Sequence, residues 1–349
     1  MCHIIFFSHH LNTFDFMELS YSFIIPVFNR PDEIEELLTS FAQMDSTLDY
    51  EIVIIEDGSS IPAKNVIDQF KNLKISYYSK PNTGPGDSRN YGMRKAKGNY
   101  FVILDSDVLL PPHYLNSVDD SLREEYIDCY GGADTAHPSF SNLQKAINYS
   151  MTSFLTTGGI RGKKNAMQKF EPRSFNLGLS KEAFEASDGF GKIHPGEDPD
   201  LVIRLWKKGY KTRLIAEAFV YHKRRISWFK FYKQVSKFGG VRPILNKWHP
   251  ESRKIVFWLP TLFVLGLVFG LVTSFYFKSI LFLWIYIVYA CLLFVSALWK
   301  TKNPVIAVQA VFAAYIQFIG YGYNFLKSTI KITFKDKPAN VLFPELFFK

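Results

Sequence analysis

Three motifs place acidic side chains where the flanking sequence would hold them. Asp57 stands in Ile-Ile-Glu-Asp-Gly-Ser-Ser, the pair Asp105 and Asp107 in Leu-Asp-Ser-Asp, and Glu197 with Asp198 in Gly-Glu-Asp-Pro-Asp-Leu. The first two motifs follow apolar, β-prone runs, and the third opens a predicted helix. Such a set could hold a nucleotide, a metal-bound diphosphate and a catalytic base along the carboxyl edge of one sheet.

Asp105 and Asp107 are separated by one residue, so in an extended chain both side chains can point the same way. Two carboxylates in that arrangement can hold a hard cation such as Mg²⁺ or Mn²⁺ and leave positions open for phosphate oxygens. The cation would neutralise the charge that develops on a departing diphosphate. An isolated Asp-x-Asp pair is more often a solvated turn, so this interpretation depends on the strand before it.

The other two motifs also have two interpretations each. The carboxylate of Asp57 could accept the imide hydrogen of uracil or the equivalent donors of guanine, but an Asp-Gly turn alone would also favour aspartate there. Asp198 is predicted to be the N-cap of a helix over Asp198–Lys208, with Pro199 in its first turn. The helix dipole stabilises its anionic form, which suits a general base, although a cap is the ordinary role of such an aspartate.

Basic residues and one histidine are further candidates. His222 follows the strand-like run Ala218–Tyr221 and could be a third metal ligand or a structural residue. Four basic residues could meet a diphosphate or a lipid phosphate, with a solvated surface charge as the alternative for each: Arg89, Arg161, Lys163 and Lys164.

Apolar runs and helical spacing predict the elements that would position these residues. Strands are expected over 22–28, 51–55, 74–78 and 100–104, with helices over 32–43, 66–70 and 87–97 between them. This order predicts a doubly wound α/β sheet with right-handed crossovers. A strand over 175–179 and helices within 145–157 and 181–186 are expected to follow.

The apolar residues, 48% of the chain, are concentrated near the C-terminus. Three runs of roughly 20 residues are each long enough to cross a hydrocarbon core of about 30 Å. They predict membrane helices rather than a buried helical core, and they cover Ile255–Phe277, Ile280–Trp299 and Val305–Leu326.

A basic and aromatic segment, residues 223–254, directly precedes the first apolar run. It holds ten Lys/Arg and the single acid Glu251. This composition predicts a segment that contacts a membrane surface rather than a nucleic acid, and it favours the cytoplasmic side of that membrane. Residues 1–16 do not resemble a signal peptide and are expected to be an extension without function. Three scattered cysteines form no metal or disulfide pattern, which suits a reducing compartment: Cys2, Cys129 and Cys291.

These motifs resemble those of the family 2 glycosyltransferases of GT-A fold. The resemblance covers about residues 20–225 and rests on six motifs in the family's order: Ser22–Asn29, Glu56–Ser59, Asn82–Gly92, Gly98–Asp107, Gly189-Phe190 and Gly196–Leu201. It implies a nucleotide-sugar-binding domain with a doubly wound mixed sheet. It also implies transfer of a sugar from a nucleotide-sugar with inversion, using Mn²⁺ or Mg²⁺.

The resemblance implies a role for each matched residue. Pro26, Asn29 and Asp57 match positions that bind the nucleotide, and Arg89 matches an arginine near the donor. Asp198 matches the general base that deprotonates the acceptor hydroxyl, and its neighbour Glu197 joins it in the predicted catalytic set.

Asp105 and Asp107 match the metal and sugar-nucleotide motif, and His222 matches a histidine near the metal in some members. The chain also departs from the family's pattern. Glu56 replaces the commoner aspartate before Asp57, and Asp87 stands where many members have a small residue. Gln234–Phe238 is only an echo of the Gln-x-x-Arg-Trp motif of processive synthases, which favours an enzyme of single transfer.

The sequence therefore predicts an integral membrane glycosyltransferase whose catalytic domain faces the cytoplasm. The expected divisions are a GT-A domain over 17–222, the interfacial segment 223–254, membrane helices within 255–326 and a tail over 327–349. A UDP-sugar is the favoured donor, and a lipid-linked acceptor is expected: a polyprenyl phosphate, a polyprenyl-diphosphate sugar or a glycolipid. More remote alternatives are an inactive membrane scaffold and a sugar nucleotidyltransferase.

The orientation of the C-terminal tail is in conflict with simple topology rules. Three full spans would place the tail opposite a cytoplasmic catalytic domain, yet the tail is rich in lysine. Val305–Leu326, which contains Gln309 and Gln317, is the weakest span and could be re-entrant or lie along the interface.

Overall fold

The computed structural model describes residues 18–135, 137–158, 170–223 and 227–348. The predicted extension 1–16 lies outside these residues, as do Arg161, Lys163 and Lys164. Strands within the described residues join into one eight-stranded sheet of order β3-β2-β1-β4-β7-β6-β8-β5. Their bounds are β1 Tyr21–Val27, β2 Tyr50–Asp57, β3 Ile75–Lys80, β4 Tyr100–Leu104, β5 Val108–Leu109, β6 Cys129–Thr135, β7 Asn176–Ser180 and β8 Thr212–His222.

Helices connect and cover these strands. Their bounds up to residue 207 are α1 Pro31–Ala42, α2 Lys64–Ile67, α3 Pro85–Lys95, α4 Tyr114–Glu124, α5 Asn142–Thr152, α6 Phe154–Thr157, α7 Lys181–Ser187 and α8 Glu197–Lys207. One face of the sheet packs against α1 and α4 through residues such as Leu37 and Val118. The other face packs against α3 and α8 through residues such as Met93 and Leu201.

The sheet is mixed, and its first four strands run parallel as the sequence predicts. In the central strand β1, Ile24 is aligned with Val53 of β2 on one side and Ile103 of β4 on the other. Strands buried on both faces are apolar along their whole length, which is why these four could be recognised. Strand β7 then pairs antiparallel with β4 and β6, which makes the sheet mixed.

The start of α8 differs from the prediction. The helix begins at Glu197, and Gly196, with a φ of 121°, is the residue before it, so Asp198 is not the N-cap. The left-handed conformation of Gly196 turns the chain into the helix without a side-chain cap. Glu197 and Asp198 both lie in the first turn, where the helix dipole still favours negative charge.

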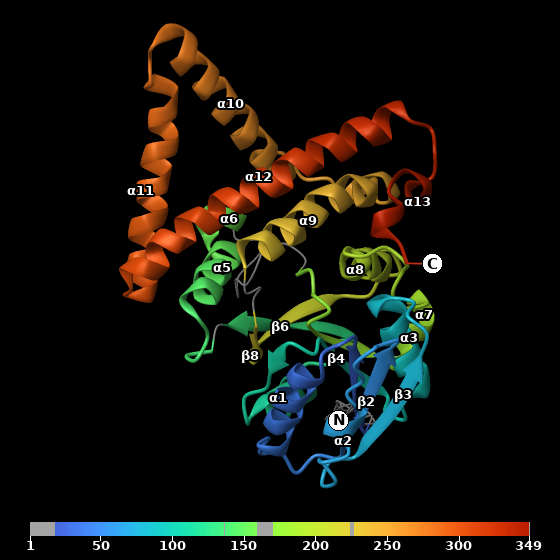
Figure 1. The fold of residues 1–349 in the computed structure, drawn as a ribbon. Coiled ribbons are helices and arrows are strands. Elements are labelled where there is room, and N and C mark those ends of the chain that lie inside the picture. The colour runs from blue at the N-terminus through green and yellow to red at the C-terminus, as the bar shows by residue number, and fades with distance from the viewer. Residues whose placement is uncertain (1–17, 136, 159–169, 224–226, 349) are drawn as a thin grey trace, which may run out of the picture.

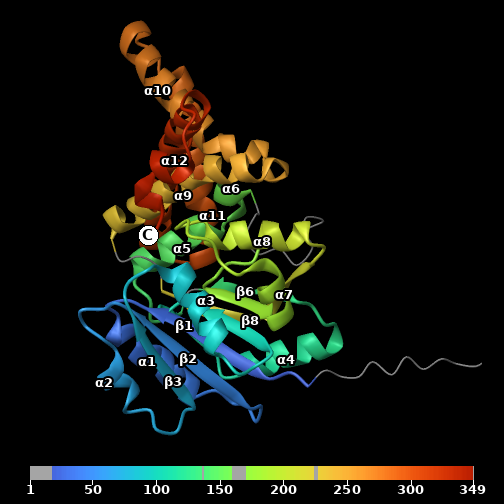
Figure 2. The same ribbon diagram turned by 90° about the vertical axis from the view of Figure 1, so that its right-hand side faces the viewer.

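A second group of helices follows the sheet. Their bounds are α9 Trp228–Trp248, α10 Leu259–Phe277, α11 Leu281–Thr301, α12 Pro304–Phe334 and α13 Ala339–Leu342. Helix α12 runs along α9, while α10 and α11 form a hairpin that extends away from the sheet (Figure 1). Figure 2 shows these helices on one side of the α/β portion.

Among the residues that the structure describes, three segments are long and apolar enough to cross a membrane: Ile255–Phe277, Leu281–Thr301 and Pro304–Phe334. The most apolar windows of the first two are only 17% and 11% buried, whereas that of the third is 39% buried. Helix α12 therefore differs from the hairpin, because much of its apolar surface already packs within the protein.

Both ends of α12 contact the α/β portion. Near its start, Ile306 and Ala310 share an apolar cluster with Tyr149 of α5. After its end, the chain returns to the loop before α8, where the His194 N–H donates to the Leu346 carbonyl at 2.8 Å. The end of the chain thus lies beside α8 (Figure 1).

Candidate active site

Asp57 ends strand β2, and its carboxylate is almost fully buried. It accepts hydrogen bonds from Lys80 Nζ at 2.6 Å and from the backbone N–H groups of Thr83 at 3.0 Å and Gly84 at 2.9 Å. Charge-assisted hydrogen bonds are shorter and stronger than those between neutral groups. Asp57 is therefore a fixed acceptor at the carboxyl edge of the sheet.

Asn29 holds the neighbouring loop against the end of β1. Its φ of 55° lies in the left-handed region, and its side-chain oxygen accepts from the Ile61 N–H at 2.9 Å. Its own N–H donates to Ser59 Oγ at 2.7 Å. Pro26 lies in β1, where it is aligned with Ile55 of β2. The three residues predicted to bind a nucleotide thus belong to two adjacent strand ends.

Arg89 links two of the predicted motifs. Its buried guanidinium places Nη2 at 2.6 Å from Asp105 Oδ1 and Nη1 at 3.1 Å from Glu197 Oε1. The guanidinium also lies 5.3 Å from the centroid of the Phe190 ring. One cation from α3 therefore holds together the exit of β4 and the start of α8.

Glu197 is buried and surrounded by cationic groups. Burial opposes its ionisation, but His194 and Arg89 outweigh that effect and lower the pKa of Glu197 to about 2. His194 Nδ1 lies 2.9 Å from Glu197 Oε1, a contact that no sequence motif indicated. Within the described chain, Glu197 Oε2 and Arg89 Nε have no hydrogen-bond partner, and buried polar atoms in this state suit a bound ligand or water.

Asp198 lies beside a different cation. Its Oδ2 accepts a long hydrogen bond from the Ser174 N–H at 3.4 Å and lies 3.8 Å from Arg173 Nη1. Burial raises the pKa of Asp198 above its usual value, Arg173 opposes this shift and the charge of Glu197 adds to it. A carboxylate with a raised pKa is a stronger proton acceptor, so the environment suits a general base.

Arg173 belongs to a chain of charges that sequence reasoning missed. It lies 3.2 Å from Glu171 Oε1, and the same oxygen lies 3.7 Å from Arg242 Nη2 of α9. Helix α9 therefore reaches the surroundings of Asp198 through Glu171. Residues 171–174 carry no recognisable motif, and their proximity to α8 comes from tertiary folding alone.

Asp107 and His222 come together at the other side of the site. His222 Nε2 lies 3.2 Å from Asp107 Oδ1, because β8 pairs with β5 and aligns His222 with Val108. His222 Nδ1 is 4.0 Å from Asp134 Oδ2. Carboxylate and imidazole are ligands that suit Mn²⁺, and the second ring nitrogen faces a carboxylate as in many metal sites.

Asp105 contacts Arg89 rather than the pair of Asp107 and His222. Among the residues that the structure describes, no three His, Cys, Asp or Glu side chains form a ready metal cluster. The predicted metal set is thus divided: Asp107 and His222 are adjacent, and Asp105 is ion-paired. The pair fits a cation whose other ligands would come from phosphate oxygens and water.

Part of the chain is similar to known glycosyltransferases. The family model described as Glycosyl transferase family 2 matches residues 22–184. The chain is 26% identical over 239 residues to chondroitin synthase of Escherichia coli, covering 58% of this chain and 34% of that protein.

Two further likenesses agree with this match. The chain is 27% identical over 202 residues to the GalNAc(5)-diNAcBac-PP-undecaprenol beta-1,3-glucosyltransferase of Campylobacter jejuni, covering 57% of this chain and 62% of that protein. Its fold is similar to that of the mannosyltransferase PcManGT of Pyrobaculum calidifontis, solved with GDP-Man and Mn²⁺, with a TM-score of 0.60, 17% identity and 86% of each chain covered.

Residues 22–184 thus resemble a family 2 glycosyltransferase domain, and the chain has a GT-A-like fold, as the sequence motifs predict. The chain spans less than two thirds of the length of either curated relative.

Proposed function

We propose that the protein is a membrane-anchored, inverting glycosyltransferase that transfers a sugar from a nucleotide-sugar, with a UDP-sugar favoured, to a lipid-linked acceptor. The observation that carries this proposal is the link that Arg89 forms between Asp105 and Glu197. It brings the motif assigned to the donor diphosphate next to the helix start that holds Asp198. Donor and base would then meet at one edge of the sheet.

In the proposed reaction, Asp198 accepts the proton of the acceptor hydroxyl while the acceptor oxygen forms a bond to the anomeric carbon. The bond from that carbon to the diphosphate oxygen breaks, and its electron pair leaves with the nucleoside diphosphate. An α-linked donor gives a β-linked product. Asp57 would accept a hydrogen bond from the base of the donor. Asp107 and His222 would hold a divalent cation, which neutralises charge on the leaving diphosphate.

The position of the apolar helices supports a lipid-linked acceptor. Helix α9 lies between the α/β portion and α12, and Arg242 of α9 contacts Glu171 near Asp198. A membrane that surrounds the α10–α11 hairpin would therefore lie close to the proposed base. The Campylobacter relative is named for an undecaprenol-linked acceptor, which agrees with this class of substrate.

We further propose that α12 lies along the membrane surface and that α10 and α11 alone cross it. Helix α12 has 31 residues, so it is about 46 Å long and exceeds the hydrocarbon thickness of about 30 Å. Its two ends contact the α/β portion, which favours one side of the membrane for both. The lysine-rich tail would then lie on the same side as the basic segment 223–254, in agreement with the positive-inside rule.

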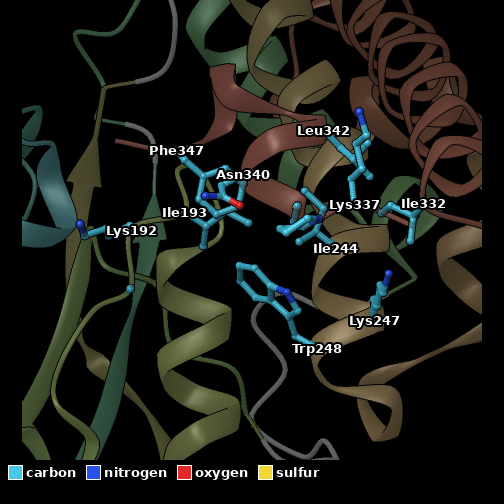
Figure 3. A pocket seen from close by; sticks show the side chains of 13 residues that line it. Lys192, Ile193, Ile244, Lys247, Trp248, Ile332, Lys337, Asn340, Leu342 and Phe347 are labelled. Atoms are coloured by element: carbon cyan, nitrogen blue, oxygen red, sulfur yellow. The ribbon is translucent and has the colours of Figure 1, made fainter. Parts of the chain in front are cut away.

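A cavity near the end of α12 supports contact with an anionic lipid group. It has a volume of about 440 Å³ and lies between α9, α13 and the loop before α8 (Figure 3). Lys192, Lys247 and Lys337 line it together with apolar residues such as Ile244 and Leu342. Lysine cations beside apolar residues complement a phosphate with a hydrocarbon tail. Replacing all three lysines by glutamate should raise the KM for a lipid acceptor without changing the KM for the donor.

The proposal is tested by measuring nucleoside diphosphate release from purified protein in detergent, with Mn²⁺ and a panel of nucleotide-sugars. Release from one donor should increase when extracted lipid is added and should be lost in Asp198→Asn. Equal glycosylation of soluble sugars and lipid-linked acceptors would contradict the lipid assignment. Pyrophosphate as the product would identify a nucleotidyltransferase instead.

A further inference from the structure

The segment 338–348 leaves the end of α12 and packs on the α/β portion next to the proposed donor site. It contains α13 and a 3₁₀ turn over Pro344–Leu346. Phe347 forms an antiparallel bridge with Ile193, and the Phe348 N–H donates to the Lys192 carbonyl at 3.2 Å. Backbone pairing therefore fixes the position of this segment along the loop that precedes α8.

Apolar contacts fix the same segment from its other side. Leu342, Phe343 and Leu346 are each at most 5% exposed. They form one cluster with Ile193 of the loop and Val241 of α9. Burial of side chains of this size typically contributes about 1.5–3 kcal/mol each, so the segment is a packed part of the fold.

Phe348 lies directly on the backbone of Gly84. A Cβ atom added to Gly84 would be only 2.3 Å from Cδ2 of the Phe348 ring, so the ring occupies the space of the absent side chain. The N–H of Gly84 is one of the groups that hold the Asp57 carboxylate. The φ of Gly84, 95°, is also one that other residues adopt only with strain.

The same ring contacts the other half of the site. Its centroid lies 5.6 Å from that of the His194 imidazole, and His194 Nδ1 lies 2.9 Å from Glu197 Oε1. Phe348 thus touches both the loop that orients Asp57 and the loop that supports Glu197. These two loops are far apart in the sequence, and the aromatic side chain fills the space between them.

We propose that Phe348 is a positioning residue for the nucleotide-sugar donor. It would act by fixing the Gly84 loop and His194 relative to each other. This inference rests on the proposed function, because it assigns the donor to the site formed by Asp57 and Glu197. Through the segment 338–348, the donor site is connected directly to α12. The segment that follows α12 would therefore support the donor site as well as join it to the apolar helices.

The test compares full-length protein with its Phe348→Ala, Phe348→Leu and Phe348→Tyr variants in detergent. Binding of UDP and of GDP is measured by calorimetry with Mn²⁺, and the donor KM and kcat are measured separately. We expect Phe348→Ala to weaken nucleotide binding and raise the donor KM roughly tenfold, which corresponds to one decade of equilibrium constant. Phe348→Tyr should restore wild-type binding, and kcat should change less than KM.

Phe334→Ala is the matched control, because this phenylalanine of α12 is 81% exposed and outside the segment. Unchanged nucleotide binding in Phe348→Ala would overturn the inference. Tighter binding would overturn it as well, because it would show that the ring obstructs the nucleotide. An equal fall in melting temperature and affinity in all three variants, tyrosine included, would indicate a purely structural role. If wild-type protein bound neither nucleotide, the proposed function would fail as well, which separates the two ideas.

Discussion

Arg89 and Glu197 are 108 residues apart in the sequence, yet Arg89 Nη1 lies 3.1 Å from Glu197 Oε1 in the interior. The side chain of each is 4% exposed, and Arg89 also binds Asp105. Because both side chains are buried, removal of one partner would leave the other charge with only part of its compensation, from Asp105 for Arg89 or from His194 for Glu197. The Arg89–Glu197 pair therefore stabilises the folded site and also contributes to its electrostatics.

Glu197→Gln should lower the free energy of unfolding by about 3–5 kcal/mol, the usual effect of breaking a buried ion pair. Denaturant unfolding of the two proteins in detergent measures the difference. Asp68→Asn is the matched control, because the Lys64–Asp68 pair is more than half exposed and should contribute less than about 1 kcal/mol. Equal destabilisation by both changes would contradict the assignment.

The buried pair of Arg89 and Glu197 also predicts how the stability of the protein depends on pH. Because the pKa of Glu197 is lowered to about 2, its ionised form stabilises the folded protein. That contribution is fully present above the unfolded pKa of 4.5 and is lost as the pH falls towards 2. The acid-induced fall in melting temperature over this range should be smaller in Glu197→Gln than in the wild-type protein.

Asp198→Asn should lower kcat about 100- to 10,000-fold, the range expected for loss of a general base. Nucleotide binding should remain, and the kcat ratio with the affinity for UDP checks both points. The acid limb of kcat/KM should lie above the usual aspartate pKa of 3.8, because burial raises the pKa of Asp198. Activity is present above the raised pKa and is lost as the pH falls through it.

The Arg173→Met variant tests whether Asp198 is the group whose titration sets the acid limb of kcat/KM. The guanidinium lowers the pKa of Asp198 against burial, so its removal should move the acid limb to higher pH. Arg123→Met serves as the control, since Arg123 pairs with Asp119 on α4 and is 48% exposed. An acid limb that does not move in Arg173→Met would argue for another base.

Local sequence patterns predicted the parallel part of the sheet because buried strands are apolar throughout. The strand expected over 100–104 coincides with β4. Strand β6, Cys129–Thr135, was not predicted, because its two glycines and its aspartate have a low β-propensity. The strand forms through its pairing with neighbouring strands. The first residue of α8 was misplaced because the turn is made by Gly196 rather than by a side-chain cap.

Parts of the site also lay beyond local patterns. His194 and Arg173 contact Glu197 and Asp198, but neither stands in a motif, and both reach α8 through loops. The return of Phe348 to Gly84 depends on the path of α12, which composition alone leaves undetermined. Sequence can propose residues that carry the chemistry, whereas their supporting contacts depend on long-range packing.

Asp57→Asn should weaken the binding of a nucleoside diphosphate about tenfold or more, the value of one charged hydrogen bond. Calorimetric titration with UDP and GDP measures the change. Lys80 would lose its buried partner, so melting temperatures are compared to separate binding from stability. Asp49→Asn is the control, because Asp49 is 83% exposed in its pair with Lys74. Unaltered affinity in Asp57→Asn would exclude contact with the base.

His222→Ala should raise the Mn²⁺ concentration for half-maximal activity by about tenfold or more. The reason is the 3.2 Å contact between His222 and Asp107, which would be shared by a bound cation. Asp107→Asn should act in the same direction, whereas His113→Ala, at the exposed residue before α4, should leave the titration unchanged. Full activity after removal of divalent cations with a chelator would contradict a metal at this pair.

The last prediction concerns the orientation of α12. A reporter fused after the tail, or inserted between Lys302 and Asn303, should lie on the same side of the membrane as the α/β portion. The reason is that Ile306 packs with Tyr149 near one end of α12, while Leu346 binds His194 beyond the other. A reporter inserted at Lys278, in the turn of the α10–α11 hairpin, should lie on the opposite side. Protease accessibility in sealed vesicles distinguishes the sides. A tail on the side of Lys278 would instead mean that α12 crosses the membrane and that the contact between Phe348 and Gly84 does not form there.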